Sequence, residues 1–292
     1  MIVDVHTHTP RHRSPLTPGA TANTTWRPDQ TRLTSLTWDE QMAALEAVDR
    51  AIVFNIAADP RRPGEEWDLM YATPTVNDDT ASFVQARPAK LIGFLTVHPH
   101  DPRALDEIER ATSDLGLRGI KLGPNYQNVD PLSEEAFRVF RRAEELGLPI
   151  LLHQGTSPNQ FADLDFAHPR HIDRVAMAFP NLRMILAHMG HPWQVDCIAV
   201  IRKHPHVYAD ISAQFYRPWS YYNAFRLASE WGTTEKLLFG SDLPIATPQE
   251  TMDALWRVND LTAGTHLPRV PEAELEGILH RDSLALLGLE DR

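Results

Sequence analysis

The chain opens with Met1-Ile2-Val3-Asp4-Val5-His6-Thr7-His8, and this stretch decides the fold class. Residues 2–5 are mostly aliphatic and β-branched, which predicts a buried strand. Residues i and i+2 of a strand share a face, so His6 and His8 are expected to point to the same side. The stretch therefore predicts a strand whose carboxyl end presents two imidazoles to the inside of the fold.

Seven further apolar runs follow, each separated from the next by a longer stretch with helical spacing. This alternation predicts βα units around a parallel sheet, and eight is the number of strands that closes a barrel. We expect an α/β fold in which residues 1–292 form one (β/α)8 TIM barrel domain. The predicted strands are residues 2–5, 51–56, 91–97, 119–122, 150–152, 184–187, 207–211 and 237–239.

Capping residues, prolines and glycines in the sequence also predict where helices and loops begin and end. Residues 37–40, Thr-Trp-Asp-Glu, form a capping box that predicts a helix to about Asp49. Residues 272–287 predict one or two closing helices, and residues 9–35 predict a long loop over the barrel mouth. The remaining signals are a helix bounded by Ser133 and Gly147, first helical turns at Pro192, Pro218 and Pro248, and a shorter loop at residues 156–168.

Polar residues end several of the predicted strands. Catalytic residues of α/β barrels lie at the carboxyl ends of strands and in the loops that follow. Beside the two imidazoles of the first strand, these ends carry Lys121, His153, His188 and Asp242, on the fourth, fifth, sixth and eighth strands. The histidines of the first strand, with His153 and Asp242, could surround a zinc-like ion. An open position on that ion would hold an acidified water.

The His-x-His pattern alone is weak, because this sequence contains it three times. The pattern at residues 98–100 contains a proline and lies just past the third strand, and the pattern at 204–206 precedes the seventh strand. Only the pattern at residues 6–8 lies at the carboxyl end of a strand. The metal prediction therefore depends on the agreement of this pair with the other strand ends.

The order His-x-His, His, His, Asp on the first, fifth, sixth and eighth strands resembles the amidohydrolase superfamily. Three phrases resemble its amidohydrolase-related branch, which includes aminocarboxymuconate-semialdehyde decarboxylase: Gly-Ile-Lys-Leu at 119–122, Ala-His-Met-Gly at 187–190 and Gly-Ser-Asp-Leu-Pro at 240–244. The resemblance extends from Val3 to about Leu289. Residues 281–284 read Arg-Asp-Ser-Leu where the branch often has Gly-Asn-Ala, so no single characterised subfamily is assigned.

The resemblance implies one divalent metal ion, held by His6, His8, His153 and Asp242, with His188 as a nearby acid/base residue. Zinc is the expected metal, with manganese and iron as alternatives. We expect a metal-dependent hydrolase that acts on a small organic substrate, a carboxylated ring, lactone or amide. Asp242 would accept the proton of the attacking water, and His188 would stabilise or protonate the intermediate.

Two other functions remain open. The same pocket suits non-oxidative decarboxylation of a small aromatic or muconate-type acid, in which the metal and an arginine orient the carboxylate and His188 helps to protonate the carbon. A catalytically silent binding barrel is the third possibility. The complete set of candidate ligands argues against it, because a silent barrel need not keep all five residues.

Lys121 has two interpretations. Some members of the superfamily carboxylate a lysine of the fourth strand, which then bridges two metal ions. Alternatively, Lys121 is a partly buried lysine that pairs with an acid or touches the substrate. We expect the second role and one metal ion, because the branch that the sequence resembles is mononuclear.

Three arginines are candidates for substrate binding. Arg11, Arg13 and Arg217 lie on loops at the catalytic face, where a guanidinium could clamp a carboxylate. Exposed arginines are common, so a purely solvated role is the alternative for each. His98 and His191 either border the pocket or lie outside it.

The expected partner is a small-molecule substrate. A formal net charge of −11 argues against nucleic acid, and no apolar run of eighteen residues suggests a membrane span. The single cysteine, Cys197, excludes an intrachain disulfide and fits a reducing compartment, so the cytoplasm is expected. Trp219, Tyr221 and Tyr222 suggest a pocket wall, a contact in a homodimer or plain helix packing.

Overall fold

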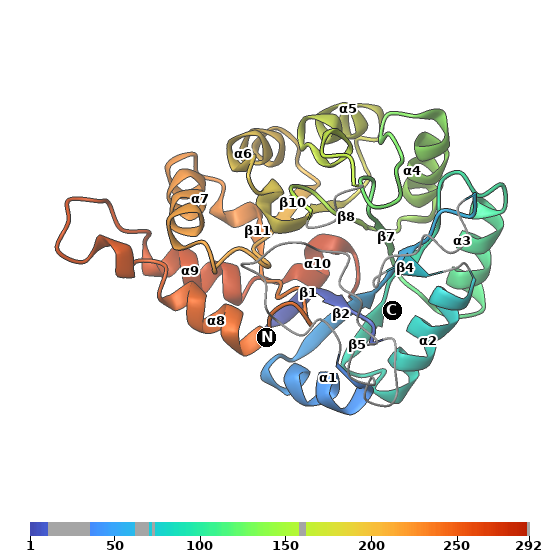
Figure 1. The fold of residues 1–292 in the computed structure, drawn as a ribbon, viewed down its shortest axis with the longest axis horizontal. Helices are drawn as coiled ribbons and strands as arrows, with labels where there is room; N and C mark the ends of the chain where they lie inside the picture. The colour runs from blue at the N-terminus through green and yellow to red at the C-terminus, as the bar shows by residue number, and fades with distance from the viewer. Residues whose placement is uncertain (11–35, 62–69, 72–73, 158–161, 291–292) are drawn as a thin grey trace.

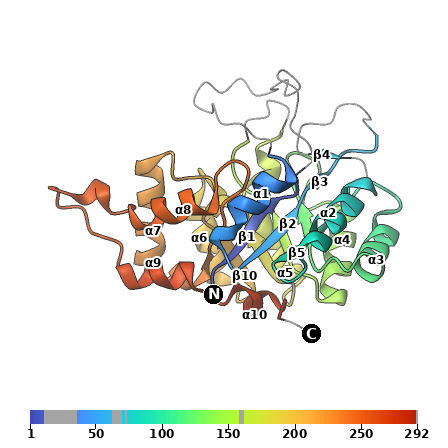
Figure 2. The same cartoon turned by 90° about the horizontal axis from the view of Figure 1, so that it is seen from below.

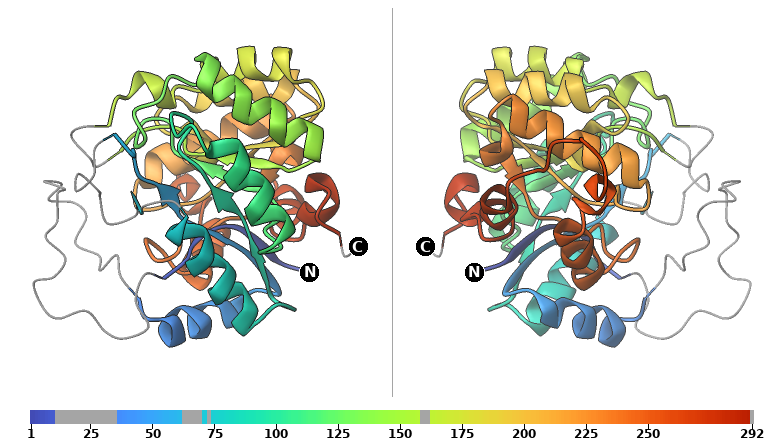
Figure 3. Two further views of the ribbon diagram at one scale, coloured as in Figure 1. Left: turned by 90° about the vertical axis from the view of Figure 1, so that its right-hand side faces the viewer. Right: turned by 90° about the vertical axis from the view of Figure 1, so that its left-hand side faces the viewer.

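A parallel sheet surrounded by helices forms the body of the molecule, with strands and helices alternating along the chain (Figure 1). The computed structural model describes residues 1–10, 36–61, 70–71, 74–157 and 162–290. Side views place the start of the first strand and the last helix at the same end of the sheet (Figures 2 and 3). Among the described helices, none is long and apolar enough to cross a bilayer.

Within the described part of the chain, all strand pairs are parallel. One sheet has the order β1-β2-β5, a second has the order β11-β10-β9-β8-β7-β6, and β3 and β4 form a small separate pair. Each of the eight predicted runs therefore contains a strand. The bounds are β1 Val3–His8, β2 Arg50–Phe54, β3 Ile56–Ala57, β4 Met70–Tyr71, β5 Leu91–Gly93, β6 Leu95–Thr96, β7 Ile120–Leu122, β8 Ile150–Leu152, β9 Met184–Leu186, β10 Val207–Asp210 and β11 Leu237–Leu238.

One extended segment joins the two larger sheets. The N–H of Phe94 donates to the carbonyl of Val53 in β2, and the N–H of Leu95 donates to the carbonyl of Gly119, the residue before β7. Successive amides of a strand point to opposite sides, so β5 and β6 together bond both neighbours. The strand predicted at residues 91–97 is thus one segment, whereas the run predicted at 51–56 is divided into β2 and β3.

The segment that follows the last strand, β11, also meets the first strand, β1. The N–H of Val5 donates to the carbonyl of Phe239 over 3.0 Å, and the N–H of His8 donates to that of Leu243 over 2.7 Å. An isolated parallel bridge joins Thr7 to Leu243. These bonds hold the segment after β11 against the carboxyl end of β1.

The helices follow the capping signals of the sequence with one exception. The capping box at Thr37 is present, Ser133 caps its helix, and Gly147 ends that helix in the left-handed conformation. Pro218 and Pro248 begin helices as predicted, but the prediction at Pro192 is wrong by two residues, since its helix begins at Gln194. The bounds are α1 Trp38–Ala44, α2 Thr75–Ala86, α3 Ala104–Ser113, α4 Glu134–Leu146, α5 Arg170–Ala178, α6 Gln194–Lys203, α7 Pro218–Glu230, α8 Pro248–Trp256, α9 Glu272–Leu279 and α10 Ser283–Leu287.

Two large apolar clusters form most of the core, and a third, small cluster consists of Ile56 and Ala58. The larger one lies between the strands and the helices. The smaller of these two, the interior cluster, gathers side chains from β1, β2, β5, β8, β9, β10, β11 and α10 and from residues beside them. It consists of Val3, Val5, Ile52, Phe54, Ile92, Phe94, Leu151, Ile185, Ala187, Tyr208, Leu238, Leu284, Leu287 and Leu289.

Candidate active site

A bulge in β1 turns both histidines of the first strand toward the inside of the sheet. The two valines of β1 belong to the interior cluster, so strict alternation would turn His6 and His8 away from it. Between Asp4 and Thr7 the register with β2 shifts, so that two residues of β1 oppose one of β2. Both imidazoles therefore face inward, each ring lying 5.2 Å from the ring of Phe54.

Asp242 meets both histidines from the segment after β11. Its N–H donates to the carbonyl of His6 over 2.7 Å, and its backbone adopts a φ of 65°. Its Oδ1 lies 3.3 Å from Nε2 of His6 and 3.2 Å from Nε2 of His8. Burial alone would raise the pKa of Asp242, but the two imidazoles hold it well below the usual value, so the carboxylate is ionised.

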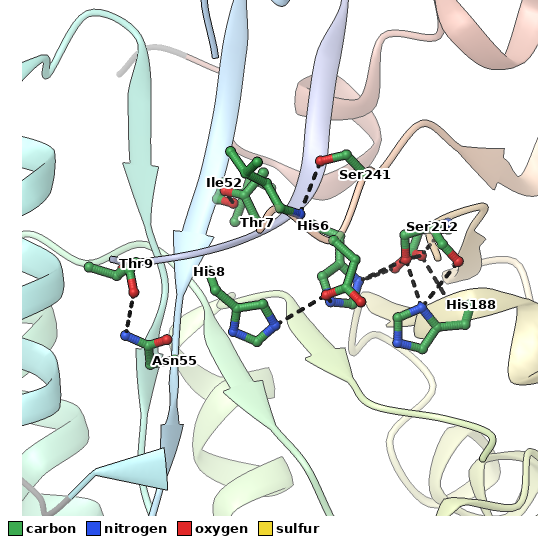
Figure 4. A network of polar contacts seen from close by, with 12 residues as sticks. His6, Thr7, His8, Thr9, Ile52, Asn55, His188, Ser212 and Ser241 are labelled. Carbon is green, nitrogen blue, oxygen red and sulfur yellow. Dashed lines mark hydrogen bonds and ion pairs between the residues drawn. The ribbon is translucent and has the colours of Figure 1, made fainter. Parts of the chain in front are cut away.

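His188 reaches the same cluster from a short 3-10 turn after β9, η3 Ala187–Gly190, in which its φ is 57°. Its ring lies 4.9 Å from the ring of His6, and its Nδ1 lies 2.8 Å from Oγ of Ser212 (Figure 4). Burial lowers the pKa of His188 to about 4. The imidazole is therefore neutral at neutral pH.

His153 follows β8 and completes the group of four imidazoles. Its ring lies 5.0 Å from the ring of His188. Its Nε2 is buried and has no hydrogen-bond partner among the described residues. Burial and the neighbouring His188 hold the pKa of His153 well below the usual value, so its ring is neutral.

The donor set of this cluster fits a divalent transition metal. His6, His188 and Asp242 each offer a ligand atom, and these three atoms lie within 4.8 Å of one another. His8 approaches the same Asp242 oxygen, and the orphaned Nε2 of His153 adds another lone pair. Neutral imidazoles and an ionised carboxylate are the ligands that zinc-like ions bind. His188 lies close enough to be a ligand as well as a proton-transfer residue.

Lys121 is buried in the wall of the cluster, with 1% of its surface exposed. Its Nζ lies 4.5 Å from the centre of the Phe54 ring. Burial lowers the pKa of Lys121 to about 7, although the carboxylates of Asp242 and Asp210 oppose the shift. The lysine is thus placed beside the candidate ligands, and its role toward the substrate stays a prediction.

Arg217 is the one predicted arginine that lies among the described residues. Arg11 and Arg13 lie outside the described residues. The guanidinium carbon of Arg217 lies 4.7 Å from the centre of the Tyr216 ring, a contact that involves none of the candidate ligands. A carboxylate clamp by any of the three stays a prediction.

The aromatic group after the seventh strand is mainly helix packing. Tyr221 and Tyr222 are buried, Tyr221 packing edge-on against Phe225 and Tyr222 donating its hydroxyl to the carbonyl of Pro268. Trp219, by contrast, is 61% exposed.

Two further histidines bond away from the cluster. The Nε2 of His98 lies 2.8 Å from the carbonyl of Gln127. The Nδ1 of His191 lies 2.8 Å from the side-chain nitrogen of Gln194. These neighbours help to position the two rings.

Sequence reasoning misses two residues of the site, Asp210 and Ser212, at the end of β10. Oδ2 of Asp210 lies 2.8 Å from Nδ1 of His6, and Ser212 contacts His188. Burial would raise the pKa of Asp210, but His6 holds it well below the usual value. The available signal was an acidic residue inside an apolar strand, which is costly unless that residue is paired.

A family model described as amidohydrolase matches residues 3–289. A curated relative, 2-amino-3-carboxymuconate-6-semialdehyde decarboxylase from Dictyostelium discoideum, is 26% identical over 130 residues. The alignment covers 44% of this chain and 34% of the relative, so this chain matches about a third of the relative's length.

Solved structures share the fold along nearly the whole chain. An uncharacterized TIM-barrel protein from Bordetella bronchiseptica is 22% identical with a TM-score of 0.69, covering 100% of this chain and 99% of that one. A dihydroxybenzoic acid decarboxylase from Polaromonas sp. JS666, solved with bound manganese and the inhibitor 2-nitroresorcinol, is 17% identical with a TM-score of 0.66. That alignment covers 100% of this chain and 98% of the other.

Proposed function

This chain belongs to the amidohydrolase family, and from that premise we propose that it is a metal-dependent hydrolase of a small organic substrate. One observation carries the proposal: an ionised carboxylate, Asp242, and a neutral imidazole, His188, lie together in a buried cluster of metal-binding side chains. Both groups accept protons, as the activation of water requires. The proposed substrate is a lactone, an amide or a carboxylated ring.

The proposed cofactor is one divalent ion held by His6, His8, His153 and Asp242, with zinc as the first candidate and manganese or iron as alternatives. Such an ion, when bound, acidifies water and polarises the substrate. Two side chains of the protein would then transfer the protons. Asp242 accepts the proton of the attacking water, and His188 accepts it in turn and delivers it to the leaving group.

Decarboxylation of a small carboxylic acid is the second candidate function. The partial match to a decarboxylase favours it. In this reaction no water attacks the substrate, and the bound ion together with a cationic side chain would orient the carboxylate that is lost. Lys121, buried beside the candidate ligands, is a described side chain with that capacity.

A substrate screen separates the two reactions. The metal-reconstituted enzyme is incubated with lactones, amides and aromatic carboxylates, while ring or amide opening and carbon dioxide release are both followed. Hydrolysis that disappears in Asp242→Asn supports the proposal. Carbon dioxide release without hydrolysis would replace it with the second function, and the absence of any metal-dependent turnover across the screen would count against both.

The finer features of the architecture belong to the same proposal. The hydrogen bonds between β1 and the segment after β11 support closure of the eight strands into a single (β/α)8 barrel domain. The buried free thiol of Cys197 supports a reducing compartment, the cytoplasm.

A further inference from the structure

One carboxylate contacts two imidazoles of the candidate site. Oδ2 of Asp210 lies 2.8 Å from Nδ1 of His6. Its other oxygen, Oδ1, accepts the backbone N–H of His188 over 3.0 Å, that of Ser212 over 3.1 Å, and the hydroxyl of Ser212. Figure 4 shows His6, His188 and Ser212, which come from parts of the chain far apart in the sequence, gathered in one network of polar contacts. Asp210 itself has none of its surface exposed.

The contact with Asp210 determines which nitrogen of His6 carries the proton. A carboxylate oxygen beside a neutral imidazole accepts a hydrogen bond, so the nitrogen that faces it must be N–H. Both nitrogens of His6 face a carboxylate, but Oδ2 of Asp210 lies 2.8 Å from Nδ1 whereas Oδ1 of Asp242 lies 3.3 Å from Nε2, so the closer contact places the proton of neutral His6 on Nδ1. Its Nε2, which faces Asp242 and His8, keeps its lone pair.

The same reasoning applies to His188 through Ser212. The hydroxyl of Ser212 donates its single proton to Asp210, so its oxygen can only accept from Nδ1 of His188, 2.8 Å away. The backbone carbonyl of Ser212, which is always an acceptor, lies 3.2 Å from the same nitrogen. Both neighbours require Nδ1–H, so Nε2 of His188 also keeps its lone pair.

We propose that Asp210 is a positioning residue that, directly for His6 and through Ser212 for His188, fixes both imidazoles with their Nε2 lone pairs turned into the site. This inference deepens the proposed function, because those lone pairs are what a metal ion or a transferred proton would meet. Replacing a carboxylate that bonds the far nitrogen of a metal-binding histidine typically lowers the metal affinity about 10- to 100-fold.

Asp210→Asn tests the role with little change in volume. Three donors converge on Oδ1, so the amide oxygen of the variant is expected there, and its NH2 group then faces Nδ1 of His6. That nitrogen must become an acceptor, which moves the proton of His6 to Nε2 and removes the lone pair. We expect the affinity for Zn2+, measured by competition with a chromophoric chelator, to fall by about 10- to 100-fold.

The matched control is Asp4→Asn. Asp4 is also fully buried, but its oxygens accept from the backbone N–H of His6 and from Ser241, and they bond neither imidazole ring. If Asp210 acts on the ring, Asp4→Asn should change Zn2+ affinity by less than about threefold. An equal loss in the two variants would reduce Asp210 to a buried carboxylate needed only for packing, and would overturn the inference.

Histidine 15N spectra of the metal-free protein give a readout independent of metal and activity. The His6 and His188 signals are identified by their loss in His6→Gln and His188→Gln. At a pH high enough to keep both rings neutral, the wild type should show the Nδ1–H tautomer for both, and in Asp210→Asn His6 should become Nε2–H. An Nε2–H form of either ring in the wild type overturns the proposal even if Asp210→Asn fails to fold. Wild-type protein that binds no Zn2+ but shows both Nδ1–H rings would instead refute the metal function alone.

Discussion

At the scale of single residues, His188 lies where it could serve either as a ligand or as a proton carrier. We expect His6→Ala and His153→Ala to lose metal and activity together, because imidazoles supply most of the binding. His188→Ala should keep most of the metal and lose turnover by about a hundredfold or more. Elemental analysis of each purified variant, beside its rate on a substrate found in the screen, distinguishes the roles.

The opposite result has a clear structural meaning. Loss of metal from His188→Ala as complete as that from His6→Ala would make His188 a ligand. His6, His188 and Asp242, whose ligand atoms lie within 4.8 Å of one another, would then all bind the ion directly.

Lys121 allows a second test at the residue scale. A carboxylated lysine would supply one oxygen to each of two ions, whereas a lysine that only touches the substrate would not affect the metal count. We expect Lys121→Ala to keep about one metal ion per chain and to lose stability, since the variant removes the packing against Phe54. Two ions in the wild type, prepared with bicarbonate and excess metal, and fewer in the variant would contradict the mononuclear site.

At the scale of elements, the loop after β8 packs directly against the turn that carries His188. A Cβ added to Gly155 would overlap the backbone carbonyl of His191, and Gly155 has a φ of 94°. Gly116 also has a positive φ, 68°, but a Cβ there would meet nothing within 4 Å. Gly116→Ala should therefore cost about 1–2 kcal/mol for the left-handed backbone alone.

Gly155→Ala should cost clearly more than its control, because the backbone itself must move. The shift would also disturb His153 and His188, so metal affinity should fall in this variant and remain unchanged in Gly116→Ala. Urea unfolding and chelator competition measure the two effects. If Gly155→Ala and Gly116→Ala have equal free energies of unfolding, the loop after β8 can move at this contact without a further cost in stability.

The elements that sequence predicts well are those fixed by local composition. The eight apolar runs and the polar residues at their ends are visible because burial selects aliphatic side chains and leaves His153 or Asp242 conspicuous. The bulge of β1 is not visible in this way, since it depends on pairing with β2. The partnership of Asp210 with His6 was missed for a similar reason, because it joins residues 204 positions apart.

At the scale of the whole molecule, a metal held by β1, β8 and the segment after β11 would tie distant parts of the sheet together. An ion that binds only the folded protein adds about 2.7 kcal/mol of stability when its free concentration is 100 times Kd. We expect chelation to lower the melting temperature and readdition of Zn2+ to restore it. His6→Ala should show no such response. A melting temperature that is independent of metal in the wild type would argue against a tightly held ion.

The interior cluster has a consequence for how the protein is made. It contains Val3 and Val5 at one extreme of the sequence and Leu289 at the other. A ribosome releases the chain from its amino end, so the inner face of β1 emerges long before α10 exists to cover it. The two valines are synthesised about 280 residues before Leu284, so a chain stalled before that residue would lack the cover that α10 gives them.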